Sequence, residues 1–270
     1  MPERKICGGV QDHMNHVLLE VCCGSADDVI EAYKAGADRV ELNSDLFHGG
    51  LTPTVGTLAV AKRETDLPIM TMIRPREGGF CYTEAEFQVC LEDARTLLER
   101  GADGLVFGFL TADGEIDLER TGTLAEITRA AGKESVFHRA IDVVSDWKRA
   151  IDLLAELHIT RVLTSGQAPS VSDGTETIRE MIAYAGSRIQ ILPGAGITLR
   201  NAGRIIRETG TNQIHIAIHR SLSDPSTRNN RAIYYGGCLY PPEDSFQMID
   251  GIAVGNLRES IRETGDGLKE

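Results

Sequence analysis

The sequence predicts an α/β protein of one domain, a (β/α)8 TIM barrel, and three observations favour this fold. Eight short apolar segments recur along the 270 residues, each followed by a helix or by room for one. Their starts lie roughly 20 to 35 residues apart, as βα units require. Polar residues follow the segments, at the end where barrels carry their active sites. No glycine-rich dinucleotide fingerprint follows the first segment, where Cys23-Gly24-Ser25 is too sparse, and this disfavours a doubly wound open sheet.

The predicted strands are apolar runs that begin after a helix stop and end in polar residues. They cover residues 17–22, 39–43, 69–73, 104–107, 135–137, 161–164, 189–192 and 213–216. Helix starts are marked by capping residues, by proline or by the end of a polar turn. These signals are Ser25, Pro53, the capping box of Thr83 and Glu86, Asp117, Ser145-Asp146, Ser172-Asp173-Gly174 and Thr198.

The two ends of the chain depart from this pattern. Residues 1–16 are predicted to be a loose N-terminal leader, and residues 17–270 the barrel. Within it, residues 218–245 contain several prolines and glycines and are predicted to be a long irregular loop. Residues 246–263 are predicted to form a C-terminal helix, and no linker divides the chain into two domains.

Composition and charge limit the class of partner. Hydrophobic residues make up 41% of the chain and aromatic residues only 5%, which suits parallel strands buried on both faces. The net charge of -12 and the pI of about 5.1 argue against nucleic acid and anionic membrane as partners. A small anionic ligand is not excluded, because local arginines can outweigh the global charge.

Six cysteines occur, but no CxxC pair, so the usual zinc and thioredoxin spacings are absent. The N-terminus has no apolar segment typical of a secretory leader, and no run is apolar enough to span a bilayer. We therefore expect reduced thiols and a cytoplasmic location.

Strand alternation selects side chains that face the barrel interior. Glu20 and Cys22 share one face of the first strand, and Glu41 and Asn43 share one face of the second. Glu20 and Glu41 are candidate catalytic acids or bases. Alternatively, they form buried ion pairs with Arg39 or Arg74 and only hold the barrel together.

Two cationic side chains follow the third strand. Arg74 and Arg76 flank Pro75, and two arginines on a rigid turn can bind a carboxylate or phosphate. The alternative is that both are ordinary surface arginines.

A histidine ends the fifth strand. His138 is a candidate catalytic base or ligand donor, and Arg139 and Asp142, which follow it, are candidate substrate-binding residues. A structural histidine is the alternative. His215, late in the eighth strand, is a further candidate for substrate binding.

Loops of small residues follow the sixth and seventh strands. Their backbone N–H groups can bind an anion where a helix begins. The candidates are Thr164, Ser165, Gly166, Gly194 and Gly196. Tight turns that need glycine are the alternative.

Soft ligands offer a different chemistry. Cys22 faces the interior, and Met70 and Met72 lie on the third strand, so together they can form a Cu(I) site. The alternative is that the methionines pack in the core and Cys22 is a small buried thiol.

Several motifs in order resemble the CutC family, which is named for copper homeostasis. They are Leu19-Glu20-Val21-Cys22, residues 36–42, Met72-Ile73-Arg74-Pro75-Arg76, residues 101–108, Phe137-His138-Arg139-Ala140, residues 161–166 and residues 193–197. The resemblance runs from about Leu18 to Ala217 and implies a (β/α)8 barrel, a cytoplasmic setting, homo-oligomers (dimers or tetramers) and, in some members, Cu(I) binding through Cys22. Asn43 stands where family members commonly carry a second copper-linked cysteine.

Two hypotheses follow. The first is a cytoplasmic protein of the copper homeostasis class that binds Cu(I) through Cys22 and has an anion pocket at the barrel mouth. The second is an isomerase or lyase acting on a small phosphorylated or carboxylated sugar-like metabolite, which Arg74 and Arg76 hold while Glu20, Glu41 or His138 moves protons.

Overall fold

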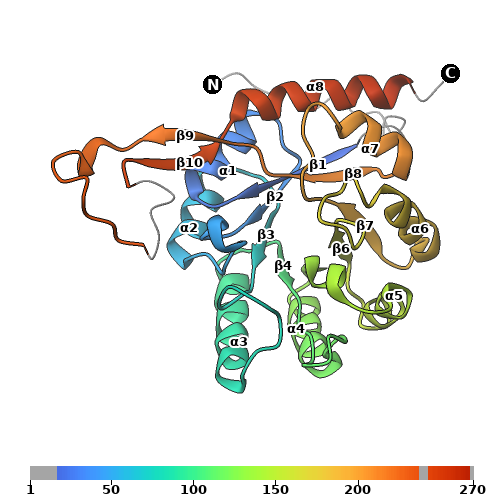
Figure 1. Ribbon diagram of the computed structural model, residues 1–270. Helices are drawn as coiled ribbons and strands as arrows, with labels where there is room; N and C mark the ends of the chain where they lie inside the picture. Colours follow the sequence, from blue (N-terminus) through green and yellow to red (C-terminus); the bar gives the residue numbers. More distant parts are fainter. Residues whose placement is uncertain (1–16, 237–242, 268–270) are drawn as a thin grey trace.

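A parallel eight-stranded sheet confirms the predicted barrel (Figure 1). The computed structural model describes residues 17–236 and 243–267. Neighbouring strands pair in the order β7-β6-β5-β4-β3-β2-β1-β8. The strands are β1 (Leu18–Cys23), β2 (Arg39–Leu42), β3 (Ile69–Met72), β4 (Gly104–Phe107), β5 (Glu134–Phe137), β6 (Arg161–Thr164), β7 (Gln190–Pro193) and β8 (Gln213–Ile216).

The ring closes between β7 and β8 by side-chain contact. The amide Nε2 of Gln213 on β8 donates to the carbonyl oxygen of Ile191 on β7 at 3.3 Å. The barrel is therefore nearly closed.

Helices alternate with the strands and surround them (Figure 1). They are α1 (Ala26–Lys34), α2 (Val55–Glu64), α3 (Glu84–Glu99), α4 (Leu118–Ala130), α5 (Trp147–Glu156), α6 (Thr175–Ala185), α7 (Ala202–Thr209) and α8 (Gly251–Gly267). Thr83 and Glu86 form the predicted capping box of α3, and Asp117 and Asp146 cap α4 and α5. The seventh helix starts later than predicted, because Thr198 lies in a turn that Asn201 stabilises.

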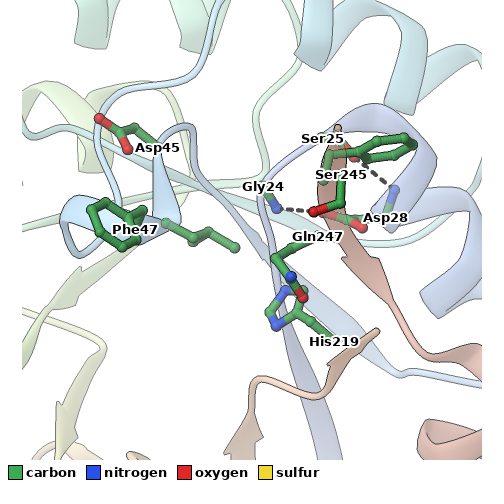
Figure 2. A pocket seen from close by; sticks show the side chains of 10 residues that line it. Gly24, Ser25, Asp28, Asp45, Phe47, His219, Ser245 and Gln247 are labelled. Carbon is green, nitrogen blue, oxygen red and sulfur yellow. Dashed lines mark hydrogen bonds between the residues drawn. The ribbon is translucent and has the colours of Figure 1, made fainter. Parts of the chain in front are cut away.

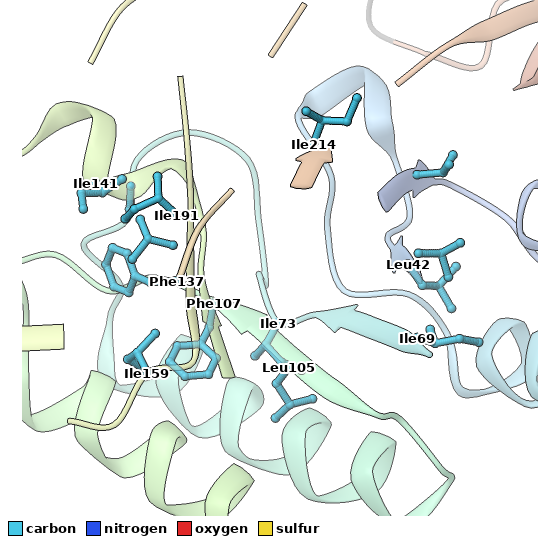
Figure 3. Close-up of a cluster of buried hydrophobic side chains, with 14 of the residues drawn as sticks. Leu42, Ile69, Ile73, Leu105, Phe107, Phe137, Ile141, Ile159, Ile191 and Ile214 are labelled. Atoms are coloured by element: carbon cyan, nitrogen blue, oxygen red, sulfur yellow. The ribbon is translucent and has the colours of Figure 1, made fainter. Parts of the chain in front are cut away.

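The core has two layers. Residues on the outer face of the strands pack under the helices, and Figure 3 shows Leu105, Phe107 and Phe137 among them. A smaller cluster fills the inside of the barrel along β3 to β7. Its members are Met70, Met72, Val106, Val136, Leu163 and Leu192. The inside of the barrel is therefore apolar on this half.

A two-stranded ribbon replaces part of the long loop predicted over residues 218–245. β9 (His219–Ser223) pairs antiparallel with β10 (Ser245–Ile249), and the short 3-10 helix η3 (Pro225–Thr227) follows β9. The ribbon projects from the barrel (Figure 1). Because residues 246–249 pair in β10, the last helix begins at Gly251 and not at 246. The predicted leader, residues 1–16, lies outside the described residues.

One buried carboxylate fixes the ribbon to the barrel. Asp28 of α1 accepts hydrogen bonds from the backbone N–H of Gly24 at 2.8 Å and of Ile249 at 2.7 Å. This side chain therefore ties the end of β1 to the end of β10. Among the described residues, no helix has the length and apolar character to cross a bilayer.

Candidate functional site

Polar side chains gather inside the barrel on β8, β1 and β2. The strand register pairs Glu20 with Arg39 on one side and with His215 on the other, and it pairs Cys22 with Glu41. All five side chains are buried. The alternation of β1 and β2 thus places Glu20, Cys22 and Glu41 on the interior face, as predicted.

Three of these side chains converge on one point. One ligand atom each from Cys22, Glu41 and His215 lies within 4.8 Å of the other two. The Sγ of Cys22 lies 3.6 Å from Oε2 of Glu41, and Nε2 of His215 lies 4.0 Å from the same oxygen. A thiol, a carboxylate and an imidazole therefore share one buried position, which we name the Cys22 cluster.

An outer carboxylate holds the histidine of the cluster. Oε1 of Glu20 lies 2.7 Å from Nδ1 of His215, and Oε2 of Glu20 accepts from Nε of Arg39. Burial opposes the charge on Glu20, but Arg39 and His215 outweigh it and hold the pKa of this carboxyl well below its usual range. Glu20 is therefore ionised at neutral pH.

The protonation of the cluster itself is shifted by its surroundings. Burial raises the pKa of the Cys22 thiol well above its usual value, and nearby Glu41 adds to this. Burial also raises the pKa of Glu41. For His215, burial acts in the opposite direction, but Glu41 and Glu20 together raise its pKa. The cluster therefore holds protons more tightly than its members would in water.

Asn43 lies above the cluster. Its Nδ2 donates to Oε2 of Glu41 at 2.8 Å and contacts Sγ of Cys22 at 3.5 Å. Its Oδ1 is buried and has no protein hydrogen-bond partner among the described residues. Asn43 thus contributes an amide, and not a second thiol, to this end of the barrel.

The predicted thioether ligands do not belong to the Cys22 cluster. Met70 and Met72 pack in the apolar interior cluster with Val106 and Leu163. The Sδ of Met70 lies against Gly104, where an added Cβ would be 2.5 Å from it. The structure therefore gives both methionines the packing role that was the alternative.

The two arginines after β3 bond to protein groups. Arg74 is buried and donates to the backbone carbonyls of His48, Gly50 and Gly78. Arg76 donates to Glu86 of the capping box at 2.6 Å and to three carbonyls of its own loop. The expected fork of two free guanidinium groups is therefore not formed.

His138 directly follows β5, at the strand tip as predicted, but it is buried and neutral. Its Nδ1 accepts the N–H of Ala140 at 3.1 Å, and the Phe80 ring lies 4.7 Å from its own ring. Burial, together with the charge of Arg74, lowers the pKa of His138 to about 3. A histidine that binds protons so weakly is a poor general base at neutral pH.

Asp142 organises the turn after β6. Its carboxylate accepts from Arg139 at 2.8 Å, from the Thr164 hydroxyl at 2.5 Å and from the backbone N–H of Ser165. The N–H of Gly166 donates to the Thr164 hydroxyl. These predicted ligand residues therefore contact one another in a single network.

The glycines after β7 allow close packing. A Cβ at Gly194 would lie 2.8 Å from Leu163 and 3.3 Å from His215, so this glycine leaves room for the imidazole. Gly196 has a φ of +88°, which favours glycine, and its carbonyl accepts from Asn201.

A cavity of about 450 Å³ lies between the ribbon and the ends of β1 and β2. In Figure 2, Phe47 lies on one side, Ser25 and Ser245 on the other, and Gly24 bonds to Asp28. Its lining also includes Asp45 and His219. The sequence did not indicate this cavity, because one wall comes from the ribbon that was predicted to be a loop.

Sequence reasoning also missed buried polar residues beneath the Cys22 cluster. Gln213 accepts from Arg39 at 3.1 Å, and Arg161 donates to Gln190 and Glu134. Strand alternation could have indicated Gln213 and Arg39 as interior residues, because Gln213 shares a face of β8 with His215, and Arg39 shares a face of β2 with Glu41.

Comparisons with known proteins match the chain to one protein family, to relatives in bacteria and mammals and to a solved structure. A family model described as the CutC family matches residues 17–220. The Treponema denticola "family protein CutC" is 52% identical over 235 residues, which is 87% of this chain and 95% of the relative. The Homo sapiens "Copper homeostasis protein cutC homolog" is 39% identical over 253 residues, covering 94% and 92% of the two chains. A CutC crystal structure from Streptococcus agalactiae has a TM-score of 0.70 and 36% identity, covering 74% of this chain and 97% of that chain.

Proposed function

The chain belongs to the CutC family, and from this premise we propose that it binds a copper ion inside the barrel through Cys22, Glu41 and His215. The motifs that carry the resemblance, from β1 to the loop after β7, include Cys22 and Glu41. The convergence of three different donor atoms within 4.8 Å supports the proposal more than any other observation.

The donor set fits a transition metal. Imidazole and thiolate both bind copper, and a carboxylate completes a mixed site. Ligand atoms around a four-coordinate ion lie about 3.3 to 3.8 Å apart for bonds near 2.0 to 2.3 Å. The separations of 3.6 and 4.0 Å around Oε2 of Glu41 are close to this range. Small side-chain movements are enough to bring the three atoms onto one ion.

Glu20 supports the same proposal by orienting His215. An ionised carboxylate beside Nδ1 requires the proton of the imidazole at Nδ1, which leaves the lone pair of Nε2 for the metal. Histidine ligands in proteins commonly have such a carboxylate behind them. Arg39 holds Glu20 in place in turn. Glu20 is therefore a positioning residue, in place of the catalytic role that the sequence suggested.

Charge balance favours a cation at this position. When Cys22 and Glu41 give up their protons, the cluster carries two negative charges, whereas Glu20 is paired with Arg39. Buried charge without a partner is costly, so a bound cation stabilises the deprotonated cluster. Binding then releases protons, because the thiol and the carboxyl are both protonated more easily than usual.

Anaerobic titration with Cu(I) against a competing chelator tests the proposal, with Cu(II) and Zn(II) titrations run beside it. We expect one copper ion per chain, lost in Cys22→Ala and weakened in His215→Gln. Cys23→Ala is the matched control, because Cys23 is the next residue and packs in the outer core. Equal retention of copper by Cys22→Ala and by Cys23→Ala would contradict this site.

We propose a cytoplasmic location, and the free thiols of Cys22, Cys23, Cys81 and Cys90 support a reducing compartment of this kind. Cell fractionation with antibody detection tests this.

A further inference from the structure

Arg74 is a buried cation without an acidic partner. The residue is 7% exposed, and its terminal nitrogens donate only to backbone carbonyls. Among the described residues, no carboxylate oxygen lies within 4.0 Å of its guanidinium group. Buried charges in proteins are normally paired with an opposite charge. The positive charge of Arg74 therefore has no counter-charge from the part of the chain that the structure describes.

Two buried N–H donors of this region also lack acceptors. Nε of Arg74 and Nε2 of His138 have no acceptor within hydrogen-bond distance among the described residues, although the Tyr82 hydroxyl lies near the Arg74 side chain. Nδ1 of His138 accepts the N–H of Ala140, so the proton of the neutral ring must be on Nε2. Nε2–H of His138 is thus a donor on the opposite side of the ring from Nδ1, which contacts the Ala140 backbone. A buried donor without an acceptor destabilises the folded protein, so an acceptor supplied by a ligand is favoured at this position.

The two donors border the same aromatic ring. The guanidinium carbon of Arg74 lies 5.5 Å from the centre of the Phe80 ring, and the His138 ring lies 4.7 Å from it. Arg74 follows β3 and His138 follows β5, so both are at the carboxyl end of the barrel strands. Gly108, which directly follows β4 between them, leaves the space in which His138 sits, because a Cβ there would lie 2.4 Å from the imidazole.

We propose that Arg74 and His138 form a binding site for an anionic oxygen of a small carboxylate or phosphate ligand at the mouth of the barrel. The charge of Arg74 attracts the anion, and Nε–H of Arg74 and Nε2–H of His138 donate to its oxygen. This site is separate from the Cys22 cluster and does not depend on copper binding. It needs one arginine and one neutral histidine, in place of the pair of arginines that the sequence suggested.

The ring of Phe80 covers the site and moves when the ligand binds. Both donor atoms are buried in the structure, so a ligand reaches them only when this cover is displaced. The backbone of Phe80 is held, because its carbonyl accepts the N–H of Leu110 at 3.0 Å. The side chain is only partly buried, so it can rotate towards solvent while its backbone stays in place.

Nuclear magnetic resonance of 15N-histidine-labelled protein tests the proposal. Acetate and inorganic phosphate are titrated separately, with sodium chloride at matched ionic strength as the third titration. We expect a saturable shift of the Nε2 signal of His138 with acetate or with phosphate, and none with chloride. The more tightly bound of the two anions identifies the class of ligand. No saturable shift with either would overturn the site, and would indicate that the Phe80 ring alone satisfies Nε2–H.

Calorimetric titration of variants with the same anion completes the test. His138→Asn keeps an acceptor for the Ala140 N–H and removes the Nε2 donor. We expect this variant to bind the anion at least about tenfold more weakly than wild type. Arg74→Lys is expected to weaken it similarly, whereas Phe80→Ala is expected to bind more tightly. Arg76→Lys is the control, because Arg76 pairs with Glu86. Thermal melting checks folding, and if Arg74→Lys does not fold, His138→Asn decides. Unchanged affinity in folded His138→Asn overturns the proposal.

Discussion

Nδ1 of His215 lies 2.7 Å from Oε1 of Glu20, although 195 positions of the chain separate the two residues. The contact joins β8 to β1, the two strands at which the chain ends and begins its circuit of the barrel. Because Glu20 remains ionised, it fixes the tautomer of His215 and directs Nε2 towards Glu41 and Cys22. The closure of the barrel therefore also sets the chemistry of the Cys22 cluster.

Glu20→Gln is expected to weaken copper binding by about 10- to 100-fold, the usual loss when the residue behind a metal-bound histidine is removed. The amide leaves the ligands Cys22, Glu41 and His215 in place but no longer requires a proton on Nδ1. Chelator competition measures the affinity. Glu134→Gln is the control, because Glu134 pairs with Arg161 outside the cluster. An unchanged affinity in Glu20→Gln would show that His215 is not oriented by this contact.

Asn43→Cys is expected to raise the affinity for Cu(I) by about tenfold or more, because it adds a second thiolate next to Cys22 and Cu(I) prefers soft ligands. The Asn43 amide already contacts Sγ of Cys22 at 3.5 Å, so a thiol at this position lies within reach of the same ion. The gain for Zn(II) is expected to be smaller. Parallel competition titrations compare the two metals, and an equal gain for both would contradict the argument from ligand softness.

The residues of the candidate functional site could be predicted only in part. Alternation on β1 and β2 placed Glu20, Cys22 and Glu41 on the inner face, because a strand has a fixed period of two. The neutral state of His138 could not be predicted, because it depends on Ala140, Phe80 and burial. These are properties of the packed barrel and not of the local sequence.

The strands were easier to predict than the ribbon for a physical reason. A strand such as β4 is buried on both faces, so its apolar run appears in the sequence. β9 is mostly exposed and polar, and it is extended because it pairs with β10 more than 20 residues later.

The contact of Arg76 also depends on the folded structure. The sequence indicated Glu86 as a capping residue, but not that the same carboxylate also accepts from Arg76.

Gly104→Ala is expected to destabilise the protein by about 1 to 3 kcal/mol or more, because overpacking a tight core forces neighbours to shift. The added Cβ would lie 2.5 Å from Sδ of Met70 and 2.6 Å from the backbone oxygen of Glu134. Gly255→Ala is the matched control. It lies within α8 with no atom near the added Cβ, so alanine is expected to stabilise by about 0.5 to 1 kcal/mol. Urea denaturation measures both variants, and equal effects would contradict the packing argument.

Asp28→Asn is expected to loosen the ribbon. An amide can accept one of the two backbone N–H bonds, from Gly24 and Ile249, but its NH2 group opposes the other donor. The expected cost is about 1 to 3 kcal/mol, as for a buried donor left unpaired. Hydrogen exchange should become faster in β9 and β10 while β4 and β5 keep their protection. Uniform acceleration across the barrel strands would show that Asp28 stabilises the whole fold and not the ribbon alone.

His138 is expected to make the protein less stable as the pH falls below about 6.5. Its pKa is about 3 in the folded protein and 6.5 for an ordinary histidine, so between these values the unfolded chain binds a proton at His138 and the folded chain does not. Protons therefore favour unfolding in this window, with a slope of about 1.4 kcal/mol per pH unit. Above the ordinary pKa the contribution is constant, because the ring is neutral in both states.

Urea denaturation at about pH 7 and about pH 5 isolates this contribution when wild type is compared with His138→Asn. The carboxylates titrate alike in both proteins. Subtracting the two pH dependences of the free energy of unfolding therefore leaves the contribution of His138. We expect wild type to lose roughly 2 kcal/mol more than the variant over this interval, since the proton taken up by the unfolded wild-type chain has no counterpart in the variant. Parallel pH dependences would mean that His138 binds a proton in the folded state as readily as in the unfolded one. In that case it could not serve as the neutral donor that the anion site requires.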